Sequence, residues 1–418
     1  ALTRLPRTTS SSVPHTRILF AALLGLPLTL QAAGTAYDAL ALDNAESGRS
    51  GAAASNSPTT RLALLSEDEV RQRLASPAGQ EELLALARSA LKERPLNAQA
   101  FWVLGHLARE GSAQSPKGEL QPAQADQLFS AGSALSRRHG GIALEELRSA
   151  AQSGNLEPSL VALDRLLLVH PEHRAQLDLL AGQLGDADLR EALAPYARRP
   201  WFAALLRSAA SEKGNPGGAA VLLADSGLGV NELAPGLLTA LFDRLVAIGD
   251  VAGAQALAAK MGTGLSPEPT NFGLGGPGGD QRFAPLAWRI SAPATIVGSG
   301  KQATVSAELM PGISAVLLER VTTYLPGAYR LSVTVSSDSL AERPQLRWEL
   351  ECLEGGTWQK RWDQSIPAGA DLQRYAMTPN WTAACTAQRW RLKAGPAEGQ
   401  LGASLRISEL ALEPSTQS

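Results

Sequence analysis

The chain has 418 residues, of which 44% are hydrophobic and 19% are charged, and its formal net charge is −2. This length exceeds what a single hydrophobic core usually holds, so we expect two or three domains. The near-neutral charge excludes the broad positive field that holds nucleic acid, and we expect no nucleic-acid partner.

Residues 1–37 have the pattern of a targeting segment. Three arginines among the first 17 residues precede an uncharged apolar run, Ile18–Ala36. Such a run is long enough to span a bilayer, and its basic flank would stay in the cytoplasm. We predict a cytoplasmic tail and membrane segment, hence a single-pass inner-membrane protein that faces the periplasm. Small residues near Ala36 leave a cleaved signal peptide, and a secreted or periplasmic protein, as the alternative.

The chain then changes from a tether to helices. Residues 38–65 include a stretch rich in Ser, Ala, Gly and Asn, which predicts a flexible tether. From 66 to 261 apolar residues recur in steps of three and four, and Ser66 with Glu69 fits a capping box. Glycine followed by Asn or Asp recurs at intervals of roughly 30 residues, which is typical of repeated helix hairpins. These pairs are Gly154-Asn155, Gly185-Asp186, Gly214-Asn215 and Gly249-Asp250.

Part of this helical region resembles a tetratricopeptide repeat. The matching residues are Pro95, Phe101, Leu104-Gly105 and Ala108, with a second partial match over Leu147–Pro171. The resemblance implies an α-solenoid of helix hairpins over 66–261, whose concave groove would bind a protein partner. The alternative is that the helices only act as a spacer.

A Gly/Pro-rich linker is predicted over 262–281. Its run Gly273–Gly279 has some likeness to a phosphate-binding loop, but no strand precedes it and Pro277 interrupts it. We therefore read it as turns and linker, and we expect no nucleotide or other cofactor.

Residues 282–414 alternate between apolar and polar side chains. Runs of this kind occur around Ala303–Leu309, Tyr329–Val335, Leu346–Cys352 and Leu405–Leu412, which predicts an antiparallel β-sandwich. The pattern resembles jelly-roll sandwiches of the carbohydrate-binding-module type. The residues that carry this resemblance are Phe283, Trp288-Arg-Ile290, Leu325-Pro-Gly327 and the closing strand at Leu405.

Two cysteines and four aromatic residues stand out in this half. In an exported protein Cys352 and Cys385 are expected to form one disulfide, the alternative being two separate buried thiols. Aromatic faces can stack on pyranose rings, so a polysaccharide platform is predicted from the residues Trp358, Trp362, Trp381 and Tyr375. Trp358, Lys360 and Trp362 would share one side of a strand. The alternative is that these rings cover the edge of the core.

We predict that the chain is not an enzyme. None of its five histidines lies beyond His173, so the β half lacks a base for a nucleophile triad. His170 and His173 flank a proline at a turn without a third ligand, so no metal site is expected. A glycan-processing hydrolase remains an alternative through paired carboxylates. Its candidate residues are Glu349, Glu351, Asp363 and Asp371.

These observations predict a membrane-tethered, periplasm-facing scaffold of the cell envelope. Its helical repeats would bind a protein partner, and its sandwich would contact polysaccharide. The layout resembles tetratricopeptide-type proteins that accompany exopolysaccharide export. The alternative is a structural adaptor whose sandwich binds protein rather than sugar.

Overall fold

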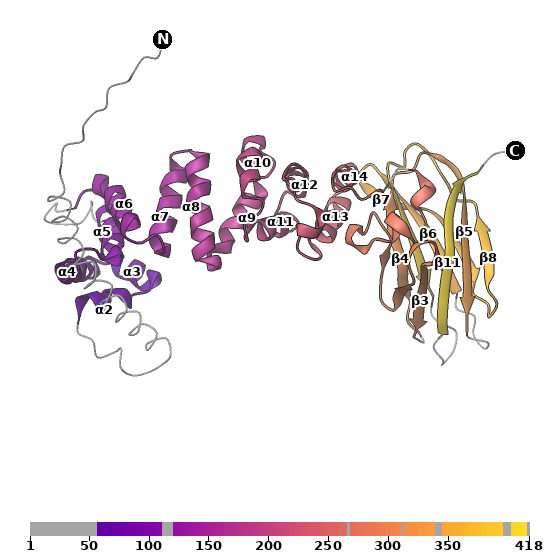
Figure 1. The fold of residues 1–418 in the computed structure, drawn as a ribbon, viewed down its shortest axis with the longest axis horizontal. Coiled ribbons are helices and arrows are strands. Elements are labelled where there is room, and N and C mark those ends of the chain that lie inside the picture. Colours follow the sequence, from indigo (N-terminus) through magenta and orange to yellow (C-terminus); the bar gives the residue numbers. More distant parts are fainter. Residues whose placement is uncertain are drawn as a thin grey trace, which may run out of the picture. The chain divides into compact units, whose positions relative to one another are not determined.

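The computed structural model describes residues 57–110, 120–265, 268–310, 312–338, 345–395 and 403–415. The chain divides between His170 and Pro171 into two compact units, which are described separately. The first unit is helical, and the second holds further helices together with two β-sheets (Figure 1). The predicted boundary near residue 261 thus falls inside the second unit.

The first unit is built from helices, and those before α8 enclose one apolar core. Buried side chains such as Val70, Leu83, Trp102 and Ile142 form that core. The predicted capping box is confirmed, because Ser66 Oγ accepts from the Glu69 backbone N–H and Glu69 accepts from the Ser66 backbone N–H. The helices are α2 (Pro58–Ala63), α3 (Glu67–Leu74), α4 (Pro77–Glu93), α5 (Ala98–Glu110), α6 (Ala125–Leu135), α7 (Gly140–Gln152) and α8 (Leu156–Val169).

Helix α2 corrects one predicted boundary. The tether was expected to reach residue 65, but residues 58–63 form a helix that packs against α4. Leu62 is fully buried, and Glu93 at the end of α4 accepts hydrogen bonds from the Thr59 hydroxyl and backbone N–H. The burial of Leu62 and the hydrogen bonds from Thr59 to the Glu93 carboxylate therefore hold this segment in place, although its composition alone predicts flexibility.

The helices of the second unit pack in two layers. Helix α11 contacts both α9 and α13, and α12 contacts both α10 and α14. Neighbours two elements apart are typical of stacked hairpins. The helices are α9 (Ala175–Gly182), α10 (Ala187–Leu193), α11 (Phe202–Ala209), α12 (Pro216–Asp225), α13 (Leu237–Ala247) and α14 (Val251–Lys260).

The recurring Gly-Asx pairs mark helix starts, as the sequence predicts. Asp186, Asn215 and Asp250 each cap a helix by accepting hydrogen bonds from the backbone of its first turn. Gly154 and Gly249 have φ of 72° and 82°, the left-handed conformation that ends a preceding helix. Local chain chemistry therefore marks where these helices begin, although Asn155 makes no side-chain cap.

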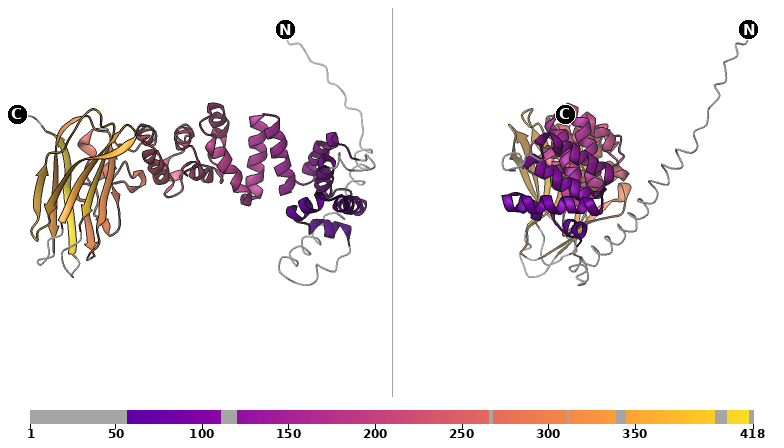
Figure 2. Two further views of the ribbon diagram at one scale, coloured as in Figure 1. Left: turned by 180° about the vertical axis from the view of Figure 1, so that it is seen from behind. Right: turned by 90° about the vertical axis from the view of Figure 1, so that its left-hand side faces the viewer.

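The β half forms an antiparallel sandwich. One sheet has the order β1-β4-β10-β6-β7 and the other β2-β3-β11-β5-β8, with β9 pairing to β5. Figure 1 shows the sheets face to face, and Figure 2 shows them from behind. The strands are β1 (Arg289–Ile290), β2 (Ala294–Val297), β3 (Thr304–Leu309), β4 (Ala315–Thr322), β5 (Gly327–Ser337), β6 (Gln345–Glu354), β7 (Thr357–Pro367), β8 (Gln373–Met377), β9 (Asn380–Trp381), β10 (Gln388–Ala394) and β11 (Ala403–Pro414).

Aromatic rings fill the space between the two sheets. Trp288, Trp348 and Trp390 have no exposed surface, and the ring of Phe272 meets Trp288 and Trp390 edge to face at 5.0 and 5.2 Å. Edge-to-face pairs of this kind stabilise a core beyond the area they bury. These three tryptophans of the β half are therefore structural.

The segment expected to be a linker is packed into the sandwich instead. Phe272 and Leu274 belong to the sandwich core, and Trp288 Nε1 donates to the Phe272 carbonyl at 2.5 Å. A Cβ on Gly275 would lie 1.9 Å from the Gly300 carbonyl oxygen, so the glycine permits close backbone contact. Gly275 thus serves packing, and the part of the segment that holds Phe272 and Leu274 is not a flexible spacer.

The last helices are joined to the sandwich by direct contacts. Asp243 of α13 forms an ion pair with Arg289 of β1, and Gln255 of α14 accepts from the Thr323 hydroxyl at 2.8 Å. The ring of Phe283 lies 6.4 Å from that of Phe242. The sandwich and the helices before it therefore form one packed body.

The structure contradicts the predicted inner-membrane location. Across the described ranges from residue 57 to 415, no helix is both long and apolar enough to cross a membrane. The run Ile18–Ala36, on which the prediction was based, lies outside the described residues, as does the tether up to residue 56.

Candidate functional site

The two tryptophans of β7 lie on opposite faces of their sheet. Trp362 is paired with Leu350 and packs against the sandwich core. Trp358 is paired with Leu353, one position beyond the core-facing Cys352, and so points outward. The ladder shifts register at a β-bulge between these pairs, which reverses the side-chain alternation. The expectation that both rings share one side is wrong.

The remaining predicted aromatics serve packing. The Arg389 guanidinium lies 4.0 Å from the centre of the Trp358 ring and covers it. Trp381 is only 6% exposed and stacks on Tyr329 with ring centres 4.4 Å apart. Tyr375 packs partly against the core and donates its hydroxyl to the Pro367 carbonyl at 2.5 Å. The four rings therefore do not form one platform.

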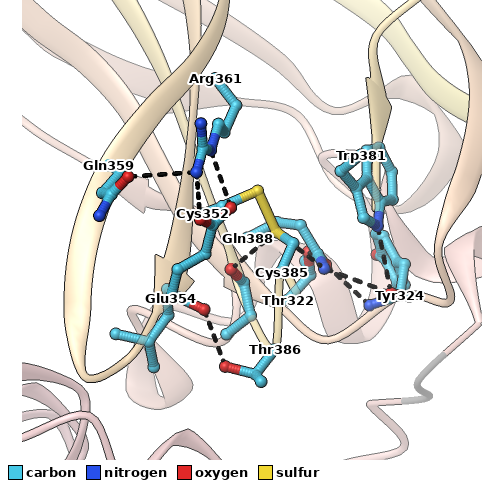
Figure 3. The surroundings of a disulfide bond; sticks show 12 residues. Thr322, Tyr324, Cys352, Glu354, Gln359, Arg361, Trp381, Cys385, Thr386 and Gln388 are labelled. Atoms are coloured by element: carbon cyan, nitrogen blue, oxygen red, sulfur yellow. Dashed lines mark hydrogen bonds and ion pairs between the residues drawn. A yellow bond between two sulfur atoms is a disulfide. The ribbon is translucent and has the colours of Figure 1, made fainter. Parts of the chain in front are cut away.

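The predicted disulfide is confirmed. Cys352 and Cys385 are bonded, with an S–S distance of 2.10 Å and Cα atoms 5.0 Å apart (Figure 3). Beside it the buried Gln388 side chain accepts from the Tyr324 backbone N–H at 2.8 Å and from the Thr322 hydroxyl at 3.0 Å. A buried amide whose hydrogen bonds are made fixes its neighbours in one arrangement. The disulfide is thus buried beside a side chain whose hydrogen bonds are made.

A pocket of roughly 490 Å³ opens beside this disulfide, and we call it the disulfide cleft. It lies between the β6–β7 hairpin of one sheet and the β5–β9 pair of the other. Asn380 and Thr382 are exposed at its rim, and Trp381 contributes to its wall. The lining residues are Gly327, Ala328, Cys352, Glu354, Arg361, Asn380, Trp381, Thr382 and Ala384.

Glu354 and Arg361 form a forked ion pair in the cleft. Arg361 Nε donates to Glu354 Oε1 at 2.8 Å, and its Nη2 donates to Oε2 and to Gln359 Oε1 (Figure 3). These hydrogen bonds lower the pKa of Glu354 and raise the pKa of Arg361, so both groups stay charged near neutral pH. The pair presents polar atoms with no net charge.

The local sequence explains this pair. Gly355 and Gly356 have φ of 56° and 83°, which only glycine adopts easily, and they turn β6 tightly into β7. Glu354 thus faces Thr357 across the hairpin. The bulge that separates the two tryptophans includes Arg361, which is skipped in the pairing register. A turn and a bulge together bring the two charges into contact.

The carboxylates considered for hydrolysis are held by cations on the outer face of the same sheet. Glu351 contacts Arg389 at 3.2 Å and Arg391 at 2.9 Å, and Asp363 pairs with Arg347. Burial raises the pKa of Glu349, but the hydrogen bond and charge of Lys393 outweigh it, so the net pKa is lowered. A general acid needs a raised pKa, and Glu349 lacks that feature. Asp371 is exposed, outside the disulfide cleft.

The predicted turn at Pro171 lies at the boundary between the two units. His170 Nε2 bonds to the Arg138 carbonyl at 2.7 Å, so its ring is engaged by backbone. Within the described stretches no three side chains from His, Cys, Asp and Glu gather as metal ligands would.

The first unit holds a second pocket of roughly 540 Å³ between α6, α7 and α8. Its floor includes the buried Glu145, which Arg148 contacts at 2.5 Å and Arg109 also binds. Val161 on α8 is 47% exposed and lines the same pocket. The other acidic lining residues are Asp126, Glu146 and Glu157.

The sequence predictions missed most of the disulfide cleft. Only Trp381 had been named as a ligand-binding residue; Asn380, Thr382, Glu354 and Arg361 had not. The Gly355-Gly356 dipeptide could have indicated the hairpin that places Glu354. The closeness of Asn380 to that hairpin depends on how two sheet edges meet, which local pattern does not encode.

No family model and no curated protein matches the chain. Among solved structures, a family 4 carbohydrate-binding module matches with 13% identity over 32% of this chain and 92% of its own, with a TM-score of 0.26. TmCBM61 in complex with β-1,4-galactotriose matches with 14% identity over 35% and 97%, with a TM-score of 0.26. The CBM22-1 xylan-binding domain of Paenibacillus barcinonensis Xyn10C matches with 8% identity over 31% and 87%, with a TM-score of 0.24. At these values the matches carry no argument about a ligand.

Proposed function

We propose that the chain is a non-catalytic binding protein whose sandwich takes a short stretch of polysaccharide in the disulfide cleft. The observation that carries the proposal is the cleft itself. It combines the exposed Asn380 and Thr382, the neutral Glu354–Arg361 pair and part of an indole around one cavity. Sugars offer hydroxyl groups to such polar atoms and C–H faces to aromatic carbon.

Because most of the predicted platform is not exposed, we propose binding of a single polysaccharide chain and not of an extended polymer surface. A flat row of rings would favour the surface of an insoluble polymer, whereas a cleft accepts a single chain. The disulfide also fits an oxidising compartment outside the cytoplasm. A link to exopolysaccharide export is kept as part of the proposal and rests only on the resemblance of the sequence layout.

The test is binding to a panel of soluble polysaccharides and their oligosaccharides, measured by affinity electrophoresis and calorimetry. Asn380→Ala combined with Thr382→Ala removes two exposed hydrogen-bonding groups. At about 1 kcal/mol each, this should weaken binding roughly 30-fold. Trp358→Phe, on the outer face, is the matched control and should bind as the native chain does.

Two results would count against this function. One is a native chain that retains none of the panel. The other is an Asn380→Ala, Thr382→Ala variant that keeps native affinity for every polysaccharide bound. Thermal unfolding should be recorded for each variant, since both replaced side chains are exposed and should leave stability within about 0.5 kcal/mol.

A protein-binding adaptor is the second candidate, and the pocket of the first unit favours it. Exposed Val161 beside Glu157 and Asp126 would suit a partner segment that joins an apolar side chain to a basic one. Val161→Asp should release a captured partner, while Leu179→Asp, at an even more exposed apolar position on α9, should not. Equal capture by the two variants would contradict this candidate.

A further inference from the structure

We infer that the disulfide cleft selects neutral sugars and rejects sugars that carry a carboxylate. The inference rests on the proposed function and adds the substrate class. It follows from the ion pair that the two charged groups of the cleft, Glu354 and Arg361, already form with each other.

The lining of the cleft contains one acid and one base. These are Glu354 and Arg361, and each occupies the other through a two-point contact. Arg361 Nη2 also donates to Gln359 Oε1, at 3.1 Å, which further restrains the guanidinium. No further cation lines the pocket within the described part of the chain.

A neutral sugar would find hydrogen-bonding capacity that the pair does not use. Within the described residues, Arg361 Nη1 has no protein partner and can donate to a hydroxyl group. Each Glu354 oxygen accepts one bond from Arg361 and keeps a lone pair for a second donor. The Asn380 amide and the Thr382 hydroxyl can each donate and accept at the rim.

An acidic sugar meets the opposite situation. Its carboxylate cannot make a two-point contact with Arg361, because Glu354 already makes it. A single bond from Arg361 Nη1 would bring the carboxylate toward the Glu354 charge. Displacing Glu354 would leave that carboxylate unpaired beside the ligand. Like charges placed together are a common means of excluding a ligand.

The experiment compares neutral oligosaccharides with uronic-acid oligosaccharides of matched length, by calorimetry at constant ionic strength. The native chain should bind the neutral series at least tenfold more tightly. Glu354→Gln removes the competing charge and frees Arg361, so binding of the uronic-acid series should rise at least tenfold. Adding Arg361→Gln should abolish this gain.

Glu82→Gln is the matched control, because Glu82 also pairs with an arginine, Arg73, at 2.9 Å on the exposed surface of the first unit. It should change neither series. Tighter binding of uronic-acid oligosaccharides by Glu354→Gln requires that the variant is folded. A correctly folded Glu354→Gln variant that binds them no more tightly than the native chain would overturn the inference.

The remaining outcomes separate the inference from the proposed function. If the native chain binds uronic-acid oligosaccharides as tightly as neutral ones, the inference fails while the proposed function stands. If it binds neither series and no cleft variant binds either, both fail.

Discussion

Arg320 of β4 donates from Nε to the backbone carbonyl of Leu286, 2.9 Å away, although only 2% of the Arg320 residue surface is exposed. The same guanidinium also donates to the carbonyl of Asn271. Burial lowers the pKa of Arg320, but a guanidinium stays protonated in proteins. One buried cation thus ties the segment before the first strand to β4.

Arg320→Met should destabilise the sandwich by about 2–4 kcal/mol, because it leaves the two carbonyls without donors. Denaturant unfolding followed by tryptophan fluorescence would measure the change. Arg330→Met, at an exposed position of β5, should stay within about 0.5 kcal/mol of the native chain. Equal effects at the two positions would show that the buried contacts do not stabilise the fold.

Removing the disulfide should cost stability through the unfolded state. The bond spans 33 residues, and a loop of that length corresponds to roughly 4 kcal/mol in the chain-entropy model. The variant Cys352→Ala with Cys385→Ala should unfold at lower denaturant concentration than the oxidised native chain. Reductant should lower the stability of the native chain and leave the variant unchanged. A loss below about 1 kcal/mol would contradict this account.

Gly275→Ala should destabilise the sandwich by more than about 2 kcal/mol, because the new methyl group would overlap the Gly300 carbonyl oxygen. Gly369→Ala is the control, since its Cβ would meet only the Gln373 side chain, at 3.6 Å. Thermal unfolding of the two variants side by side would measure the difference. A tolerated Gly275→Ala would mean that the segment is less closely packed than described.

Acid should weaken the first unit. Burial lowers the pKa of His106 and of His139 to about 4. The folded state therefore binds fewer protons than the unfolded state, whose histidines have a pKa near 6.5. The stabilisation is complete above about pH 6.5 and is lost as the pH falls toward about 4. At pH 4.5 the loss should be roughly 2 kcal/mol per histidine.

NMR titration of the imidazole rings would test this directly, because the chain has only five histidines. His139 Nδ1 accepts from the Ile142 N–H at 3.2 Å at the start of α7, so protonation there removes a helix cap. His139→Gln should reduce the stability difference between pH 7 and pH 4.5. Ring signals from His106 and His139 that both titrate near 6.5 would overturn the prediction.

Local pattern predicted much of the fold. The cap at Asp250 and the strand at β5 are encoded within a few neighbouring residues, and the structure has both where the sequence places them. Both faces of β5 are buried, including Ser332 and Thr334, which the alternation of apolar and polar residues did not predict. The disulfide was predicted from cysteine number and compartment. The prediction of a flexible linker over 262–281 was wrong. Glycine content favours flexibility in the sequence, and only the fold shows that Gly275 lies against the backbone of Gly300.

The candidate site was harder to predict for a related reason. One extra residue at Arg361 changes which face Trp362 occupies, and nothing in the letters of β7 marks a bulge. The burial of Trp381 depends on Tyr329 and Trp390, which come from other strands. The spacing of residues predicts which side chains share one face of a strand only where the strand has no bulge.

The packing of Phe272 and Leu274 inside the sandwich determines where the chain can be cut. A fragment that begins at residue 282, where the strand pattern starts, would leave a void beside Trp288 and Trp390 and would be prone to aggregate. A fragment that begins at Pro269 would keep the core side chains of Phe272 and Leu274. A sandwich that starts at residue 282 is therefore incomplete. A fragment that is transferred to another protein must include the glycine-rich segment with Phe272 and Leu274.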